Sequence, residues 1–343
     1  MKSKTISRRD FLQLAALGAG ASALYACAPT PAPATVVTQP PPTDTPVPEP
    51  TQIPTPAAPQ PVLRIAHISD MHIEPSGPGR EKFSRAMRSI QNLSPAIDFI
   101  INAGDCVMDS LFSSPQRANE QWDTFQSVLG PDFPIKVHHA IGNHDVWGWG
   151  LIQKEQDLYK DDPLFGKGLI MQRLGMDNRY YSFNQSGWHF IVLDSVHPRE
   201  VTESEHPYTG KLDEEQYTWL EKELETTAAA TPVCIVSHIP ILGTCGLLDG
   251  NNESSGNWNM PGAWMHIDAR RLFSLFWKHP NVKLCLSGHT HQVEDLRYHG
   301  VKYLTNGAIS GNWWQGPYFD FPPGYVLLSL YADGTSESEY IAY

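Results

Sequence analysis

The chain has 343 residues, of which 41% are hydrophobic and 18% are charged. This balance is typical of a folded protein and excludes a disordered or fibrous chain. The 25 lysines and arginines are outnumbered by 37 aspartates and glutamates, so the net charge is −12. A non-specific nucleic-acid binder is therefore not expected. The 5 cysteines form no C-x-x-C pair, which argues against a zinc ribbon or a dense disulfide framework.

Residues 1–27 are expected to be an export signal. Arg8 and Arg9 precede an apolar run over 14–24, which is too short to cross a bilayer at about 20 residues per helix. The arginine pair resembles a twin-arginine signal, which exports folded proteins. The segment that ends at Cys27 resembles a bacterial lipobox, whose cysteine is lipidated. The alternatives are cleavage after Ala28 or a plain apolar role for Cys27.

Residues 28–61 form a linker in which 13 of 34 residues are proline. Proline lacks an N–H and fixes φ, so an extended, semi-rigid tether is expected rather than a helix or sheet. The folded domain then covers residues 62–343, which suffice for one large core. Together the three segments predict a membrane-anchored protein of the bacterial cell envelope, facing outside the cytoplasm.

Five short apolar segments are expected to be strands buried on both faces. They cover residues 63–69, 96–102, 135–141, 233–237 and 282–287. Helical patterns lie between them, which predicts an α/β fold. One helix is expected to begin at Asp213, with Gln216 placed for a capping box, and another covers about 266–278. Residues 180–183 and 188–194 alternate around a short turn and predict a β-hairpin.

Each of the five strands is followed by side chains of the types that can bind metals. These are Asp70, His72, Asp105, Asn143, His144, His238, His289 and His291. Ligands bind at the carboxyl ends of strands in open α/β sheets, so we expect a shared site. The number of histidine and carboxylate ligands suggests two metals, and the lack of cysteine excludes a structural thiolate zinc site. Two close cations would lower the pKa of bound water to about 7 and neutralise phosphate oxygens.

The motifs D-x-H, G-D, G-N-H-D, a single histidine and G-H-x-H follow one another in this order over about residues 62–310. In this respect the chain resembles the calcineurin-like metallophosphoesterase family. The resemblance implies a four-layer α/β/β/α sandwich of two mixed sheets with flanking helices. It also implies an enzyme that hydrolyses phosphoester bonds, in which a metal-bridged hydroxide attacks phosphorus in line.

The resemblance further implies a division of the ligands between two metals. The first metal would be held by Asp70, His72 and His291, the second by Asn143, His238 and His289, and both by Asp105. His144 would protonate or stabilise the leaving group, and Asp145 would orient His144 or cap the turn. Ligands of this type suit divalent or trivalent ions of Mn, Fe, Zn or Co. If the chain folds before export, the metals available in the cytoplasm decide, and Mn or Fe is expected ahead of Zn.

Met108 separates the chain from two branches of that family. Purple acid phosphatases have an iron-binding tyrosine at this position, and the protein phosphatases have an aspartate that partners the catalytic histidine. The sequence is more similar to the D-x-H phosphodiesterase-like branch. The expected substrate is a phosphorylated small molecule or a lipid-linked phosphate. A phosphomonoesterase, a nucleotide pyrophosphatase and a non-catalytic binding lipoprotein remain alternatives, and the oligomeric state is open.

Long loops after the motifs hold six of the ten tryptophans. These are Trp147, Trp149, Trp258, Trp264, Trp313 and Trp314. Aromatic side chains beside a phosphate site could stack on a nucleobase or contact a lipid, or they could simply cover a sheet edge. We expect Asn312 and Trp313 to line the substrate pocket.

Overall fold

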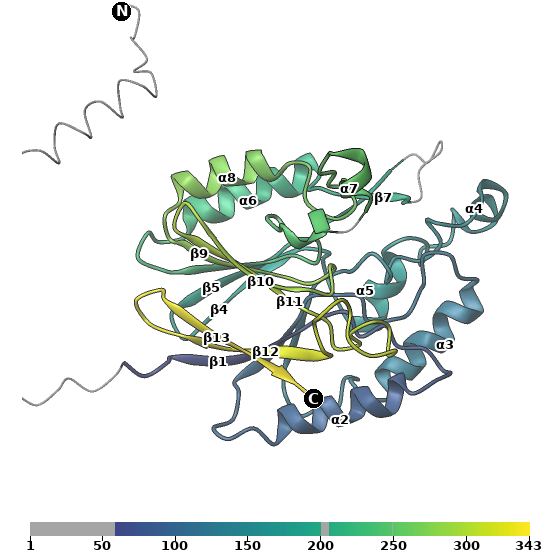
Figure 1. The fold of residues 1–343 in the computed structure, drawn as a ribbon, viewed down its shortest axis with the longest axis horizontal. Helices are drawn as coiled ribbons and strands as arrows, with labels where there is room; N and C mark the ends of the chain where they lie inside the picture. The colour runs from purple at the N-terminus through teal and green to yellow at the C-terminus, as the bar shows by residue number, and fades with distance from the viewer. Residues whose placement is uncertain (1–58, 200–205, 249) are drawn as a thin grey trace, which may run out of the picture. The chain divides into compact units, whose positions relative to one another are not determined.

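The computed structural model describes residues 59–199, 206–248 and 250–343 (Figure 1). The expected export signal, Cys27 and most of the linker lie outside these ranges. Among the helices within them, none combines the length and the apolar character needed to cross a membrane.

The first sheet joins the two ends of the folded domain. Its five strands lie in the order β13 (Ser336–Ala342), β12 (Gly324–Leu330), β1 (Leu63–Ile68), β2 (Phe99–Asn102) and β3 (Val137–His139). β1 runs parallel to β2 and antiparallel to β12, and β2 runs parallel to β3. The first sheet is therefore mixed, with its parallel strands at one side.

The second sheet has six strands and is also mixed. They lie in the order β10 (Val293–Tyr298), β11 (Val301–Asn306), β9 (Val282–Ser287), β8 (Val233–Val236), β5 (Trp188–Val192) and β4 (Tyr181–Gln185). The four central strands are parallel, and both edge strands pair antiparallel. A small ribbon of β6 (Val196–Pro198) and β7 (Tyr208–Gly210) lies apart from both sheets.

The two sheets pack face to face and helices cover their outer faces (Figure 1). The core between the sheets combines side chains of both, such as Ile65 and Leu286. α2 (Gly79–Gln91), α3 (Pro115–Gln126) and α5 (Gly168–Leu174) bury apolar residues against the first sheet, and α6 (Glu214–Thr226) and α8 (Ala269–Lys278) bury theirs against the second. The four-layer sandwich predicted from the sequence is confirmed.

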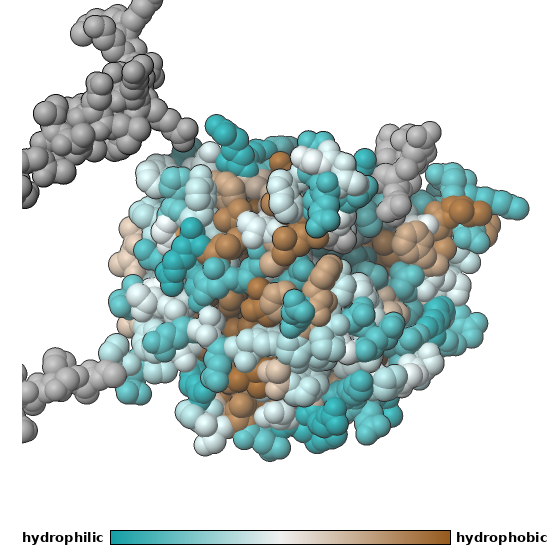
Figure 2. All heavy atoms as spheres, in the orientation of Figure 1, coloured by the Kyte–Doolittle hydropathy of each residue, from teal (hydrophilic) through white to brown (hydrophobic). Residues whose placement is uncertain are grey.

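Shorter elements occupy the loops. They are α4 (Gln153–Tyr159), η2 (Cys245–Leu248) and α7 (Asn252–Ser255). α4 buries none of its residues and exposes Leu158, and brown atoms gather at this end of the molecule in Figure 2.

Local sequence explains where several elements begin and turn. The side chain of Asp213 accepts a hydrogen bond of 2.8 Å from the amide of Gln216, which caps α6 at the predicted start. The predicted capping box is wrong, however, because the Gln216 side chain does not reach back to Asp213. Its Oε1 atom accepts from the amide of Asp194 at 2.8 Å, and its Nε2 atom donates to the Asp194 carbonyl at 2.9 Å. The predicted hairpin is present as β4 and β5, and its turn residues Ser186 and Gly187 both have positive φ.

The carboxyl ends of the parallel strands meet at one edge of the sandwich. The amide of Asp70, after β1, donates to the carbonyl of Gly104, after β2, at 3.0 Å. The amide of Gly288, after β9, donates to the carbonyl of His238, after β8, at 3.1 Å. These bonds tie together the loops that carry the motifs.

Candidate metal centre and active site

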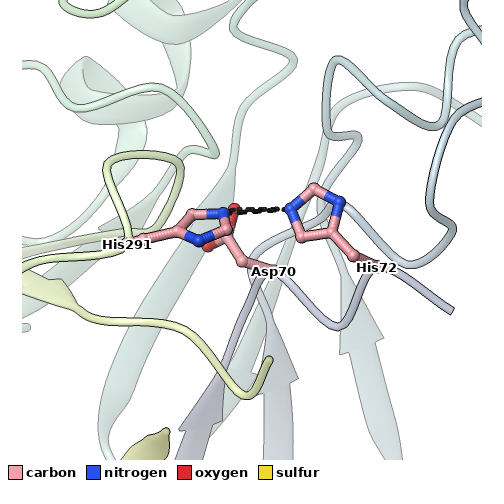
Figure 3. Close-up of side chains that lie close together, drawn as sticks. All are labelled: Asp70, His72 and His291. Atoms are coloured by element: carbon pink, nitrogen blue, oxygen red, sulfur yellow. Dashed lines mark hydrogen bonds and ion pairs between the residues drawn. The ribbon is translucent and has the colours of Figure 1, made fainter. Parts of the chain in front are cut away.

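Three predicted ligands of the first metal form one buried cluster (Figure 3). The Nε2 atoms of His72 and His291 are 3.0 Å apart. The Asp70 Oδ1 atom lies 3.4 Å from His291 Nε2 and 3.9 Å from His72 Nε2, and it has no hydrogen-bond partner. Three donor atoms therefore face a common point, as metal ligands do.

The predicted ligands of the second metal form a neighbouring cluster. His238 Nε2 lies 2.9 Å from Asn143 Oδ1, 3.1 Å from His289 Nδ1 and 3.2 Å from Asp105 Oδ2. The same Asp105 oxygen lies 3.8 Å from His72 Nε2 in the first cluster. Asp105 is therefore placed between the two groups, where a bridging carboxylate is expected.

Backbone carbonyls set the tautomers of three of these histidines. The acceptors are Ala103 for His238 at 2.9 Å, Ala263 for His289 at 2.9 Å and Gly311 for His291 at 2.6 Å. A carbonyl only accepts, so the ring nitrogen that faces it carries the proton. The other nitrogen of each neutral ring then turns a lone pair toward the cluster. This arrangement is typical of metal-bound histidine, so the residues present fit a dimetal centre.

The charges around the clusters favour bound cations. Burial raises the pKa of Asp70, but His291 and His238 outweigh it and hold this pKa at about 2. Burial lowers the pKa of His289 to about 3, so this ring is neutral. Burial opposes a proton on His238, but Asp105 and Asp70 raise its pKa to about 9. The two carboxylates that hold this proton would hold a metal ion in its place.

His144 lies at the rim of the clusters, where one of its ring nitrogens forms a third group of possible ligand atoms with His72 and Asp105. Its ring packs edge-on against His72 with the centroids 4.7 Å apart. Its Nδ1 atom lies 2.7 Å from the carbonyl oxygen of Met108, and its backbone amide donates to Asp105 Oδ1 at 2.8 Å. The ring is thus positioned by contacts with the backbone.

The Asp145 carboxylate contacts backbone amides and not the His144 ring that it was predicted to orient. Its carboxylate accepts from the amides of Asp105, Cys106, Val107 and Gly142, at 2.9, 2.8, 3.3 and 3.0 Å. None of the contacts of this side chain reaches the His144 ring. These contacts fit the second predicted role, in which Asp145 caps its own turn through the Gly142 amide, and they also hold the backbone amide of Asp105.

The backbone is left-handed at most of the predicted ligands. Positive φ values of 45° to 73° occur at Asp70, His72, Asp105, His289 and His291. Such values are uncommon outside glycine and concentrate at functional sites. At these residues the backbone therefore leaves the extended conformation of the preceding strand.

Two motif glycines allow the loops to approach. A Cβ atom at Gly142 would collide with the backbone and carboxylate of Asp105. A Cβ atom at Gly288 would collide with Ser69 and Asp70. The glycines of G-N-H-D and G-H-x-H therefore make room for the carboxylates of Asp105 and Asp70.

A cavity of about 210 Å³ opens beside the clusters. The predicted pocket residue Trp313 lines it, with its ring centroid 4.5 Å from that of His291. Asn312 is not among the lining residues; its amide instead donates to Gly316 at 2.9 Å within a turn. The lining residues outside the predicted set include Tyr208, Trp264, Gln292, Tyr318 and Phe319.

The sequence indicates a role in the site for some of these additional lining residues but not for others. Gln292 directly follows the G-H-x-H motif, so its position was a usable signal. Tyr208 and Phe319 lie far from any motif, and only the folding of the loops brings them to the cavity.

The other tryptophans of the loops have mixed roles. Trp147 is buried in the core, and Trp258 is 65% exposed. Trp314 is buried and donates from Nε1 to the carbonyl of His72 at 3.1 Å. Trp314 therefore supports a predicted ligand from behind.

A two-sheet sandwich with carboxylates and histidines clustered at its strand ends defines a dinuclear metallohydrolase. Residues 63–293 match the model of the family described as calcineurin-like phosphoesterase. The chain belongs to this family. With the clusters above, it is a phosphoric ester hydrolase with a dimetal centre.

Several characterised proteins are similar to the chain. A 3′,5′-cyclic-nucleotide phosphodiesterase of Nostoc is 27% identical over 289 residues, which are 80% of this chain and 90% of the relative. A 3′,5′-cyclic adenosine monophosphate phosphodiesterase of Escherichia coli is 24% identical over 299 residues, 83% and 91% of the two chains. The crystal structure of a dimetal phosphatase from Danio rerio shares the fold, with a TM-score of 0.56, 18% identity and coverage of 83% and 100%.

Proposed function

We propose that the chain is a phosphodiesterase that hydrolyses 3′,5′-cyclic nucleotides. The observation that carries this proposal is that seven predicted ligands meet beside a cavity that also receives His144. Relatives that act on cyclic nucleotides match most of the chain, which supports this substrate class. The complete ligand set argues against the alternative of a non-catalytic binding lipoprotein.

Residues of this chain divide the work between binding and proton transfer. Bound metals would supply a nucleophile and neutralise phosphate charge. Asp70, His72 and His291 would hold one ion, Asn143, His238 and His289 the other, and Asp105 both. His144 Nε2 would donate a proton to the leaving oxygen, while the Met108 carbonyl keeps Nδ1 protonated and the ring in place.

Manganese or iron is the proposed metal. The ligand atoms are imidazole nitrogen, carboxylate oxygen and one amide oxygen, with no cysteine in the clusters, and this set suits Mn, Fe or Zn. A relative described as a manganese-dependent ADP-ribose/CDP-alcohol diphosphatase of Arabidopsis thaliana is 24% identical over 290 residues. Its name supports Mn over Zn. It also makes a nucleotide diphosphatase the second candidate function.

Export and lipidation are proposed from the N-terminal residues. Arg8, Arg9 and Cys27 have the arrangement of a twin-arginine lipoprotein signal, and residues 28–61 would hold the domain away from the membrane. Changing Cys27 to Ser should move the protein from the membrane fraction to the soluble exported fraction. A Lys-Lys replacement of the arginine pair should retain it inside the cell.

Hydrolysis by the purified full chain tests the substrate class. The protein loaded with Mn²⁺ is assayed with bis-p-nitrophenyl phosphate, p-nitrophenyl phosphate, 3′,5′-cyclic AMP and ADP-ribose. A higher kcat/KM for the diester and the cyclic nucleotide supports the proposal. A higher value for ADP-ribose supports the diphosphatase, and preference for the monoester would make the chain a phosphomonoesterase.

A further inference from the structure

Gln292 is a buried polar side chain that the predicted chemistry does not use. It lies next to His291, lines the cavity and is only 3% exposed. Its backbone carbonyl accepts from the amide of Gly307 at 3.1 Å. Its carboxamide, by contrast, makes no hydrogen bond with any of the residues that the structure describes. A carboxamide on the wall of a cavity that has no protein partner offers its donors and its acceptor to a molecule bound there.

Three aromatic side chains form a row that leads from the clusters to the surface. Trp313 lies against His291, with Tyr318 edge-on to Trp313 at 5.6 Å and Phe319 edge-on to Tyr318 at 4.8 Å between centroids. All three line the cavity, and Phe319 is 54% exposed. Aromatic faces of this kind stack on nucleobases.

We propose that this part of the cavity binds the base of a nucleotide and that Gln292 reads its edge. The row of Trp313, Tyr318 and Phe319 provides the stacking surface, and the phosphate lies at the metal clusters beside it. The inference rests on the proposed function and adds the specificity of the site. It assigns Gln292 as a specificity-determining residue.

The chemistry of a carboxamide favours adenine among the purines. Gln292 offers one acceptor and two donor hydrogens. Adenine presents a donor at N6 and an acceptor at N7, which a glutamine pairs with in bidentate fashion. Guanine presents acceptors at both O6 and N7, so the carboxamide oxygen would be left without a partner on this edge.

Removal of the Gln292 carboxamide tests the preference for adenine over guanine. The full chain loaded with Mn²⁺ is assayed with 3′,5′-cyclic AMP and 3′,5′-cyclic GMP. The quantity compared is the ratio of kcat/KM for cyclic AMP to kcat/KM for cyclic GMP. Gln292→Leu removes the carboxamide, so adenine loses two hydrogen bonds and guanine loses one. The ratio is therefore expected to fall by about tenfold, the effect of one base contact. Gln315→Leu is the matched control, because Gln315 is exposed in the loop that carries Trp313 and does not line the cavity. It should leave the ratio within about twofold, well below that effect.

Binding gives a readout that is independent of turnover. By calorimetry, 5′-AMP should bind the full chain more tightly than 5′-GMP, and Phe319→Ala should weaken both by loss of stacking. Equal binding of the two nucleotides, with a ratio that Gln292→Leu does not change, would overturn the inference. If bis-p-nitrophenyl phosphate is still hydrolysed in that case, the proposed phosphodiesterase function stands. If no phosphodiester is hydrolysed, that function fails, and the AMP and GMP affinities alone decide the role of Gln292.

Discussion

The Nδ1 atom of His144 lies 2.7 Å from the carbonyl oxygen of Met108. Phosphatases of this family that carry an aspartate at the position of Met108 use it to partner the histidine, and here the backbone of the same residue takes that place. Asp109, one residue later, instead accepts from the amide of Phe112 at 3.1 Å. A neutral His144 held in this way carries its proton on Nδ1, so donation from Nε2 requires the doubly protonated ring.

Replacement of His144 should therefore affect substrates according to their leaving group. His144→Ala is expected to lower kcat for 3′,5′-cyclic AMP by about 10²- to 10⁴-fold, the usual contribution of a general acid. The loss should be much smaller for bis-p-nitrophenyl phosphate, because p-nitrophenolate leaves without protonation. Steady-state kinetics with both substrates and metal analysis of the same sample provide the measurement. Equal losses for both substrates would exclude the proton-donor role.

Removal of the bridging carboxylate should change the metal content. Asp105 lies between the two clusters, so Asp105→Ala is expected to lose at least one ion per chain and all measurable activity. Asn143→Ala, which touches only the second cluster, should lose less metal. Elemental analysis after dialysis gives the stoichiometry. Full metal content in Asp105→Ala would show that this residue is not a ligand.

Asp145 should act through the metal and not through His144. In the unchanged protein, backbone amides donate to both oxygens of the Asp145 carboxylate. Asp145→Asn keeps the shape of the side chain but replaces one of these accepting oxygens with an NH₂ group, which cannot accept. We expect metal affinity to fall by about 10- to 100-fold, as for other residues that support ligands. Activity titrated with Mn²⁺ measures this affinity. An unchanged affinity with a shifted pH profile of kcat would instead restore the orienting role.

The ligand positions were predictable because each lies within a few residues of a strand end. The strands are apolar runs and the motifs follow them directly, so local sequence carries both. The order of the strands in the sheets was not predictable in this way. β1 pairs with β12, which comes from the far end of the domain, and Leu63 lies opposite Leu330. Such pairing depends on packing between distant segments, and no local pattern encodes it.

The lining of the cavity was predictable only in part for the same reason. Trp313 lines it, but Asn312 does not; Asn312 lies in a turn in which its amide donates to Gly316, and Trp313 in the same turn has a left-handed φ of 43°. Tyr208 comes from β7, outside both sheets, and carries no motif. Substrate specificity therefore depends on loop conformations that the motifs do not determine.

Buried neutral histidine should make the fold sensitive to acid. His67, on β1, is fully buried and neither ring nitrogen has a hydrogen-bond partner. Burial lowers its pKa to about 3, although Asp70 opposes this, whereas an unfolded chain has the ordinary value near about 6.5. As the pH falls from about 6.5 toward 3, the unfolded state takes up a proton that the folded state does not, so stability is lost.

His67→Leu should therefore reduce the dependence of unfolding free energy on pH. The slope between pH 6 and 4 is expected to decrease by at most about 1.4 kcal/mol per pH unit, the value for one proton. Urea unfolding of both proteins in EDTA removes the separate contribution of metal release. The exposed His299 provides the control, since His299→Leu should leave the slope unchanged. An unchanged slope in His67→Leu would mean that His67 is protonated in the folded state, which requires a partner or a water that hydrates its ring.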